Sequence, residues 1–310
     1  SQAFKAALRG TRGADRLEDL KAEGVNLRAA AQWALDEGDY ETAVTLYGPL
    51  RVLATRQADD QGLAAFGDRL LDEAELPPNS HVELLVEHAS LLIHKHDPAR
   101  AVALADTALH IAGESEEASL IVRALWLRGD IARNEGRLER SVDMLEQASK
   151  LARDHRLWNL LAMSLTTLAA ATHLLGDVKR AIAQTEEALD LSRSLDDRAL
   201  EAVNLGNLAH YYGHRGDVSR EQAFYRACIR LHRQSGRRLP LAIMLSNLAG
   251  TRAREGHFDE ARALFVEALE INRSLGALKH VGVVLSNLAI LESETGELER
   301  ARQLIYEAIQ

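Results

Sequence analysis

Three asparagines recur at equal intervals, each within a Leu-x-Asn-Leu-Ala string: Asn207, Asn247 and Asn287. A primary amide has both hydrogen-bond donors and an acceptor, so a row of amides can pair with successive peptide groups of an extended chain. The alternative is that each asparagine bonds to a neighbouring helix of its own chain. Because one such hydrogen bond contributes only about 0.5–1.5 kcal/mol, neighbouring side chains must provide any selectivity.

Side chains suited to recognition stand near these asparagines in the same register, and small residues between them leave room for a ligand. Surface positions that vary without any function would show the same pattern. The candidates that join the three asparagines in the predicted partner-binding site are His210, His214, Tyr211, Arg254, Trp126 and Asp130.

His210 and His214 are four residues apart, a spacing that lets two imidazoles on one helix share a metal ion. The sequence provides neither the glutamate of an HExxH motif nor a third ligand at a defined position, so we predict polar groove residues and no metal site. It also lacks a phosphate loop, a dinucleotide fingerprint and a GxSxG elbow. We therefore predict no catalytic residues, no cofactor and no enzymatic activity.

Composition narrows the class of protein further. The 310 residues include 37 Lys and Arg against 46 Asp and Glu, a net charge of −9, which argues against direct binding of nucleic acid. The single cysteine, Cys228, excludes an internal disulfide. Since no apolar run is long enough to cross a bilayer, we expect no membrane partner and a cytoplasmic location. The chain starts at Ser1 rather than Met, which is compatible with an excised fragment, and the sequence leaves open whether it belongs to a longer protein.

The 40-residue interval extends to several further columns. Glycines stand at 136, 176, 216, 256 and 296, with a leucine eleven residues before each and a small residue seven before. Apolar residues three and four apart on both sides of each glycine predict a helical hairpin. An aspartate able to cap the next helix follows two of these glycines, at Asp177 and Asp217, and two earlier turns have one at Asp39 and Asp97.

These columns resemble the tetratricopeptide repeat (TPR) in a 40-residue form, with about six repeats over residues 81–310. The resemblance implies an all-α, right-handed solenoid of helical hairpins whose first helices line a concave face. The asparagine row resembles the asparagine ladder of kinesin light chain and Pins-type repeats, which holds a peptide backbone. Three positions depart from the pattern. His96, which lies outside the residues that the structure describes, replaces the turn glycine of the first repeat, Glu221 replaces a small residue, and Cys228 fills an alanine position, where we expect it to pack.

Residues 1–80 are less regular, and we predict a divergent helical hairpin plus one extra helix at about 60–75. Gly48 and Pro49 are expected to interrupt the helix that follows Asp39. The segment from Val25 to Asp39 resembles the start of the C-terminal TPR region of bacterial STAND-class signalling ATPases and their LuxR-like relatives. In that family the repeats sense a signal or partner.

The resulting hypothesis is a regulatory module that binds a peptide or protein partner in the concave groove of residues 120–310. The alternative is a small-molecule effector near Trp33, Trp126 and Trp158. An arginine column at 153, 193, 233 and 273 is interpreted as structural. The last helix has an apolar face at Leu304, Ile305 and Ile309, so we expect either a longer protein or self-association through this edge.

Overall fold

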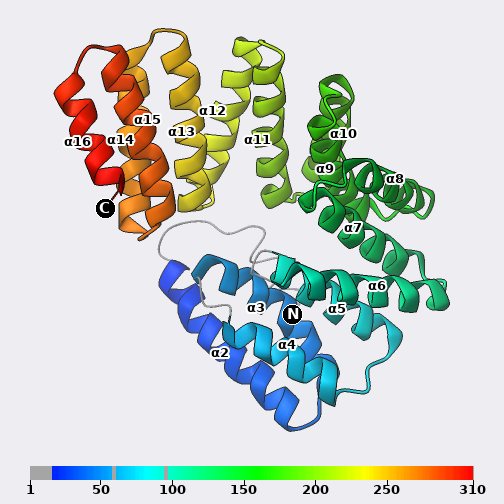
Figure 1. Ribbon diagram of the computed structural model, residues 1–310. Coiled ribbons are helices and arrows are strands. Elements are labelled where there is room, and N and C mark those ends of the chain that lie inside the picture. The colour runs from blue at the N-terminus through cyan, green and yellow to red at the C-terminus, as the bar shows by residue number, and fades with distance from the viewer. Residues whose placement is uncertain (1–15, 58–60, 94–96, 310) are drawn as a thin grey trace. The chain divides into compact units, whose positions relative to one another are not determined.

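The structure, a computed structural model, describes residues 16–57, 61–93 and 97–309. Within these ranges the chain forms fifteen α-helices and no β-strand (Figure 1). The prediction of an all-α helical solenoid is confirmed. None of the described helices is both long enough and apolar enough to cross a lipid bilayer.

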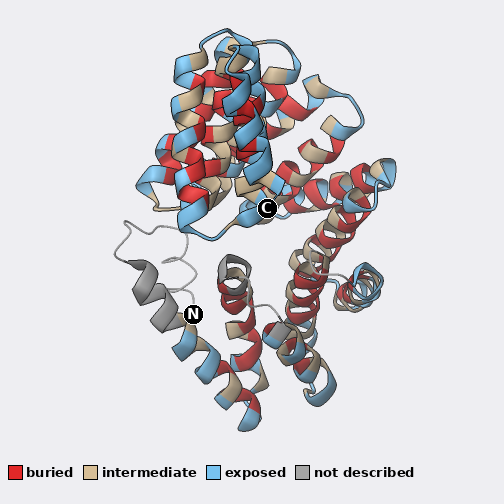
Figure 2. Ribbon diagram, turned by 60° about the vertical axis from the view of Figure 1, so that its left-hand side comes forward, coloured by how far each residue is buried: buried red, intermediate tan, exposed pale blue. Residues whose placement is uncertain are grey.

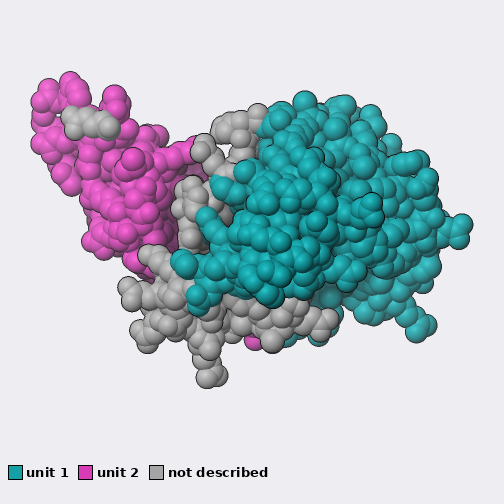
Figure 3. Space-filling model, turned by 90° about the horizontal axis from the view of Figure 1, so that it is seen from below, with its two compact units in different colours: residues 1–10, 14–197 teal, residues 11–13, 198–310 magenta. Residues whose placement is uncertain are grey.

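The helices gather into two compact units, which are coloured separately in Figure 3. The described part of unit 1 ends at Asp197 and holds α2 (Arg16–Asp36), α3 (Tyr40–Gln57), α4 (Gln61–Glu73), α5 (Pro78–Ile93), α6 (Pro98–Ser115), α7 (Ala118–Asn134), α8 (Leu138–Asp154), α9 (Trp158–Leu174) and α10 (Val178–Ser194). Unit 2 begins at Arg198 and holds α11 (Arg198–His214), α12 (Val218–Gln234), α13 (Arg238–Arg254), α14 (Phe258–Ser274), α15 (Leu278–Glu294) and α16 (Leu298–Ile309). The predicted division at residue 80 separates irregular from regular repeats and stays a prediction.

The helices from α7 to α15 are all equal in length, and short turns of one size join them within each unit. One residue in each turn has a positive φ, so the backbone repeats at half the interval of the sequence columns. These residues are Glu116, Gly136, Arg156, Gly176, Asp196, Gly216, Gly236, Gly256, Gly276 and Gly296. The sequence revealed only alternate turns, because three of the others carry a side chain where glycine is the ordinary choice.

Hydrogen bonds close the turns in a recurring way. In the turn after α7, for example, the amide of Gly136 donates to the carbonyl of Arg133, and the amide of Arg137 donates to the carbonyl of Ala132 at 2.8 Å. This Schellman arrangement satisfies carbonyls that the helix end would leave unpaired. The four predicted aspartate caps are confirmed, since each carboxylate accepts from the backbone amide three residues later.

The small-residue column marks the points where helices come closest. Its members Ala89, Ala169, Ala209, Ala249 and Ala289 are at most 3% exposed. Figure 2 colours the buried residues of the described helices red. In the hairpin of α7 and α8 the column holds Gly129, where a Cβ atom would stand 2.6 Å from Cγ of Leu145. Short side chains therefore set the distance between the two helices of a hairpin.

The N-terminal helices depart from the sequence prediction at one point. Helix α3 continues through Gly48 and Pro49 to Gln57, so the predicted interruption was wrong. Although proline lacks one helical hydrogen bond, the flanking Tyr47, Leu50 and Leu53 are all buried, and their packing holds the helix together. The predicted extra helix is α4.

A polar cluster with a buried centre joins α3, α4, α5 and α6 in unit 1. The hydroxyl of Tyr47 and Nδ1 of His88 are 2.7 Å apart, and Nε2 of His88 lies 2.7 Å from a carboxylate oxygen of Asp68. Arg100 completes the cluster with an ion pair to Asp68 at 2.7 Å. Burial lowers the pKa of His88, so its neutral form accepts from Tyr47 at Nδ1 and donates to Asp68 from Nε2.

The arginine column links second helices of successive repeats. Arg153 pairs with Glu187 at 2.6 Å, Arg233 pairs with Glu267 at 2.7 Å, and Arg273 pairs with Glu307. Three of the four arginines thus pair with an acid on the second helix of the next repeat, which supports the structural interpretation of this column. Cys228 is 1% exposed and its thiol donates to the carbonyl of Ala202, as expected of a packing residue.

Helix α16 exposes part of its apolar surface. Leu304 is buried, whereas Ile305 is 50% exposed and Ile309 is 78% exposed. Self-association through this edge stays a prediction.

Candidate functional site

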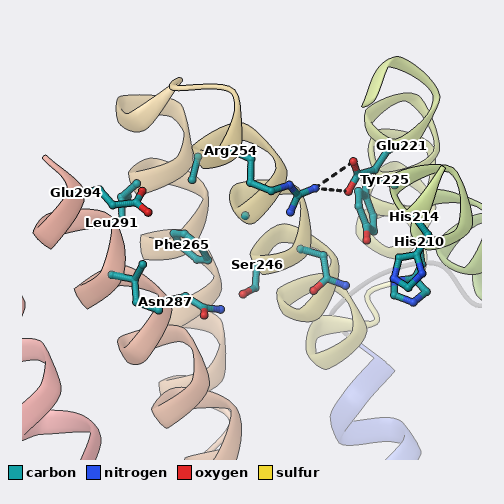
Figure 4. A pocket seen from close by; sticks show the side chains of 15 residues that line it. His210, His214, Glu221, Tyr225, Ser246, Arg254, Phe265, Asn287, Leu291 and Glu294 are labelled. Carbon is teal, nitrogen blue, oxygen red and sulfur yellow. Dashed lines mark hydrogen bonds and ion pairs between the residues drawn. The ribbon is translucent and has the colours of Figure 1, made fainter. Parts of the chain in front are cut away.

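A cavity of about 690 Å³ opens on one face of unit 2 (Figure 4). First helices α11, α13 and α15 contribute most of its wall, while Tyr225 of α12 and Phe265 of α14 reach it from the second helices. The volume lies in the range of small-molecule and peptide-side-chain sites. The hairpin repeat thus positions the cavity, because it brings corresponding faces of the first helices side by side.

Four positions on each first helix share the face that carries the cavity, since they are spaced by four, three and four residues. We call this surface the first-helix face of unit 2. Its rows are Val203, Ile243 and Val283; Asn207, Asn247 and Asn287; His210, Gly250 and Ile290; and His214, Arg254 and Glu294. The first of these rows is apolar, and Val203 and Val283 are about half exposed.

The asparagine row reaches the cavity at two of its three positions. Asn247 and Asn287 line the cavity, whereas Asn207 stands on α11 outside it. Asn247 is exposed, and the other two are partly exposed. Among the residues that the structure describes, none of these three side-chain amides takes part in a hydrogen bond. Their donors and acceptors are therefore accessible to a partner.

Glu221 places a carboxylate in the cavity wall from α12. It occupies the position that holds a small residue in every other repeat, and it is only 4% exposed. Gly213 makes the room, since a Cβ atom there would stand 2.8 Å from Cδ of Glu221. The departure that the sequence showed is thus compensated by a glycine on the facing helix.

Arg254 balances the buried carboxylate from the next repeat. Its Nη2 donates to both carboxylate oxygens of Glu221, at 2.9 and 3.2 Å, and the hydroxyl of Thr251 donates to the same carboxylate at 2.6 Å. The arginine side chain is nevertheless 63% exposed. Its Nε and Nη1 make no hydrogen bond to any part of the chain that the structure describes, so one side of the guanidinium is open to the cavity (Figure 4).

Two other titratable side chains of the cavity wall, those of His210 and Tyr225, are uncharged near neutral pH. The imidazoles of His210 and His214 lie 4.3 Å apart between ring centroids. Partial desolvation lowers the pKa of His210, and charge on His214 lowers it further, while Glu221 acts in the opposite direction. Burial raises the pKa of Tyr225 to about 12, so its phenol stays protonated.

The remaining predicted site residues lie elsewhere. Tyr211 is 3% exposed and does not line the cavity. Trp126 and Asp130 belong to α7 of unit 1, where the indole donates to the hydroxyl of Thr167 at 2.9 Å and the carboxylate accepts from Arg133 at 2.7 Å.

Sequence reasoning missed several residues of this face. Glu294 and Ile290 were visible in the 40-residue register but were not chosen, and the apolar row that starts at Val203 was overlooked. Phe265 reaches the cavity from the second helix of its hairpin, where no column pointed to a site. Glu221 did give a signal, because it departs from a column of small residues.

Comparison with known families identifies the repeat. Sequence models described as tetratricopeptide repeat match residues 240–310 and 122–155. No curated protein sequence is significantly similar to the chain.

Several solved structures share the fold. One is a Signal Transduction ATPase with Numerous Domains (STAND) protein with a tetratricopeptide repeat sensor from Pyrococcus horikoshii, with a TM-score of 0.70, 14% identity, and coverage of 92% of this chain and 45% of the STAND protein. A Rap protein complexed with competence and sporulation factor has a TM-score of 0.66 and 14% identity, over 99% of this chain and 89% of the Rap protein. NprR in complex with its cognate peptide NprX has a TM-score of 0.57 and 19% identity, over 83% and 75% of the two chains.

Proposed function

This chain is a tetratricopeptide-repeat protein, and its fold resembles that of a STAND signalling ATPase with a tetratricopeptide repeat sensor. We therefore propose that it is a non-enzymatic regulatory module that binds a peptide or protein segment. The predicted groove covered residues 120–310, and we place the binding surface on the first-helix face of unit 2. In this proposal the partner lies along the asparagine row, and side chains of the partner enter the cavity.

One observation carries this proposal: the amides of Asn207, Asn247 and Asn287 repeat in register and have no hydrogen-bond partner within the described chain. Amides that served only to join helices would be engaged by the neighbouring helix. A row of unengaged amides beside an open cavity is the arrangement that a peptide backbone can pair with.

Helix packing fixes the length of segment that fits. Helices α13 and α15 contact each other directly, and packed helix axes lie about 8–10 Å apart. An extended chain advances about 3.3 Å per residue, so about three residues bridge neighbouring first helices. On the same spacing for α11 and α13, a segment of about six residues spans the row from Asn207 to Asn287.

The similar structures favour a sensory role. One of them carries a tetratricopeptide repeat sensor in a signalling ATPase, and two were solved with a bound factor or cognate peptide. We extend this to the chain as a proposal: it is the sensor part of a bacterial signalling or transcription regulator, acting in the cytoplasm.

Affinity selection from a random pool of hexapeptides tests the proposal with the full chain. The triple variant Asn207→Ala/Asn247→Ala/Asn287→Ala should lose about 100-fold in affinity for the selected peptides, because up to three backbone contacts disappear. A matched control removes three amides outside the row, in Asn159→Ala/Gln234→Ala/Gln303→Ala, and should bind as the wild type does.

Circular dichroism separates binding from folding. If the triple variant unfolds while the control does not, the amides are structural and the proposal fails. It also fails if the wild-type chain retains no peptide from the pool.

A small-molecule effector is the second candidate, and the cavity volume of about 690 Å³ favours it. The tryptophans that the sequence suggested for such a site do not mark this cavity, since Trp33 lies on α2 and is 63% exposed, while Trp158 lies on α9 and is 44% exposed. A thermal-shift screen of metabolites tests this alternative, because a ligand of the folded state raises the unfolding temperature. The shift must disappear in Phe265→Ala if the ligand occupies the cavity.

A further inference from the structure

The cavity of unit 2 holds one cation that is both oriented and accessible. Two hydrogen bonds to Glu221 fix the direction of the Arg254 guanidinium, yet most of its side chain is exposed. In Figure 4 the guanidinium extends from α13 across the cavity toward Glu221. Its Nε and Nη1 groups have no partner among the described residues, and each can donate a charge-assisted hydrogen bond to a carboxylate oxygen of a partner.

Deepening the function proposed above, on which it rests, we infer that Arg254 binds an acidic side chain of the peptide partner and that Glu221 positions the arginine for it. The acidic residue belongs to the interior of the peptide rather than to its C-terminus. This follows because Arg254 stands on α13, the middle of the three first helices, while asparagines on α11 and α15 hold the chain on both sides.

The charges around Arg254 restrict the acid to one place. Glu294 lines the same cavity from α15, so a second partner acid opposite α15 would meet a like charge. On the α11 side the lowered pKa of His210 leaves an uncharged imidazole near neutral pH. Among the described residues that line the cavity, Arg254 is the one arginine or lysine.

The composition of the two halves agrees with an anionic partner at unit 2. Residues 198–310 hold 15 Lys and Arg against 13 Asp and Glu, whereas residues 1–197 hold 22 against 33. An acidic peptide is therefore repelled by unit 1 and tolerated by unit 2.

A positional-scanning set of hexapeptides, acetylated and amidated at their ends, tests the inference on the full chain. Each pool fixes Asp, Asn or Lys at one position. We expect the Asp pool to bind about 10- to 100-fold more tightly than the Asn pool at one interior position and no more tightly at the others. A second set with a free C-terminal carboxylate should show no added affinity.

Variants assign the preference to the arginine. Arg254→Gln should remove the preference for Asp, Arg254→Lys should keep part of it, and the control Arg233→Gln, which also removes one positive charge from unit 2, should keep all of it. Because Arg254→Gln leaves a buried carboxylate without its cation, the double variant Glu221→Gln/Arg254→Gln repeats the test with a neutral cluster. It should also lose the preference.

The outcomes separate the two proposals. Pools that bind with equal affinity for Asp and Asn overturn the acidic subsite and leave peptide binding intact. A gain that requires the free C-terminus assigns Arg254 to a terminal carboxylate and overturns the interior placement. Pools that do not bind at all overturn both.

Discussion

The buried polar clusters of the two units are built in the same way and serve different ends. In unit 1, Gly67 makes room for Tyr47 and His88, as Gly213 makes room for Glu221 in unit 2. Tyr47 and His88 are both 0% exposed, so their hydrogen bonds serve only to hold helices together. Glu221 instead holds an arginine that remains open to a cavity. The arginine that completes the cluster of unit 1, Arg100, is 43% exposed but lines no part of this cavity, so the cavity beside Arg254 distinguishes the candidate site.

The largest expected effect comes from filling the space at Gly67. A Cβ atom there would stand 2.6 Å from both Nδ1 of His88 and the hydroxyl of Tyr47, so Gly67→Ala breaks a buried hydrogen bond and overpacks the core. We expect a loss of about 3 kcal/mol in the free energy of unfolding. For Gly213→Ala the expected loss is smaller, about 1 kcal/mol from overpacking, because Glu221 can move into the cavity.

Urea denaturation followed by circular dichroism measures both variants. Equal losses of unfolding free energy in Gly67→Ala and Gly213→Ala would contradict the distinction between the cluster of unit 1 and the cluster beside the cavity of unit 2.

Acid should weaken unit 2 through a histidine that lies outside its site. Burial lowers the pKa of His232 to about 4, compared with about 6.5 in an unfolded chain. Between these values the unfolded chain binds a proton that the folded chain does not, so the stability conferred by the neutral histidine is lost as the pH falls from 6.5 to 4. The expected loss is about 3 kcal/mol.

His232→Ala, which restores the small residue found at this position in α6 and α8, should make the unfolding free energy less dependent on pH over that range. His88 also has a lowered pKa, but the carboxylate of Asp68 opposes the shift. A variant with the same pH profile as the wild type would refute the assignment to His232.

The smallest effect concerns the turns, in which the two units also differ. All five described turns of unit 2 have glycine at the positive φ, whereas unit 1 has Glu116, Arg156 and Asp196 in three of its turns. A residue with a side chain costs about 1 kcal/mol in this conformation. We expect Arg156→Gly to stabilise the protein by about 1 kcal/mol and Gly276→Arg to destabilise it by a similar amount.

The midpoint of thermal unfolding checks both changes, and shifts of the same sign in the two variants would contradict the prediction.

The sequence alone determined the repeat, because close helix packing needs small residues and tight turns at fixed intervals. The columns of Gly and Ala, the aspartate caps and the all-α hairpin fold could all be read from the 40-residue spacing. The sequence also indicated Asn247, Asn287 and Arg254 as candidate binding residues, and the structure places these three around one cavity.

Only the tertiary structure decided which side chains face the core and which face the cavity, because spacing along one helix does not contain that information. Whether a side chain faces the core or the cavity depends on contacts between helices, which is why Tyr211 is buried while its neighbour His210 lines the wall. Likewise, the helix through Pro49 persists because of packing around Tyr47 rather than local propensity. The role of Glu221 required knowing that Gly213 lies opposite it and that Arg254, from the next repeat, reaches back to its carboxylate.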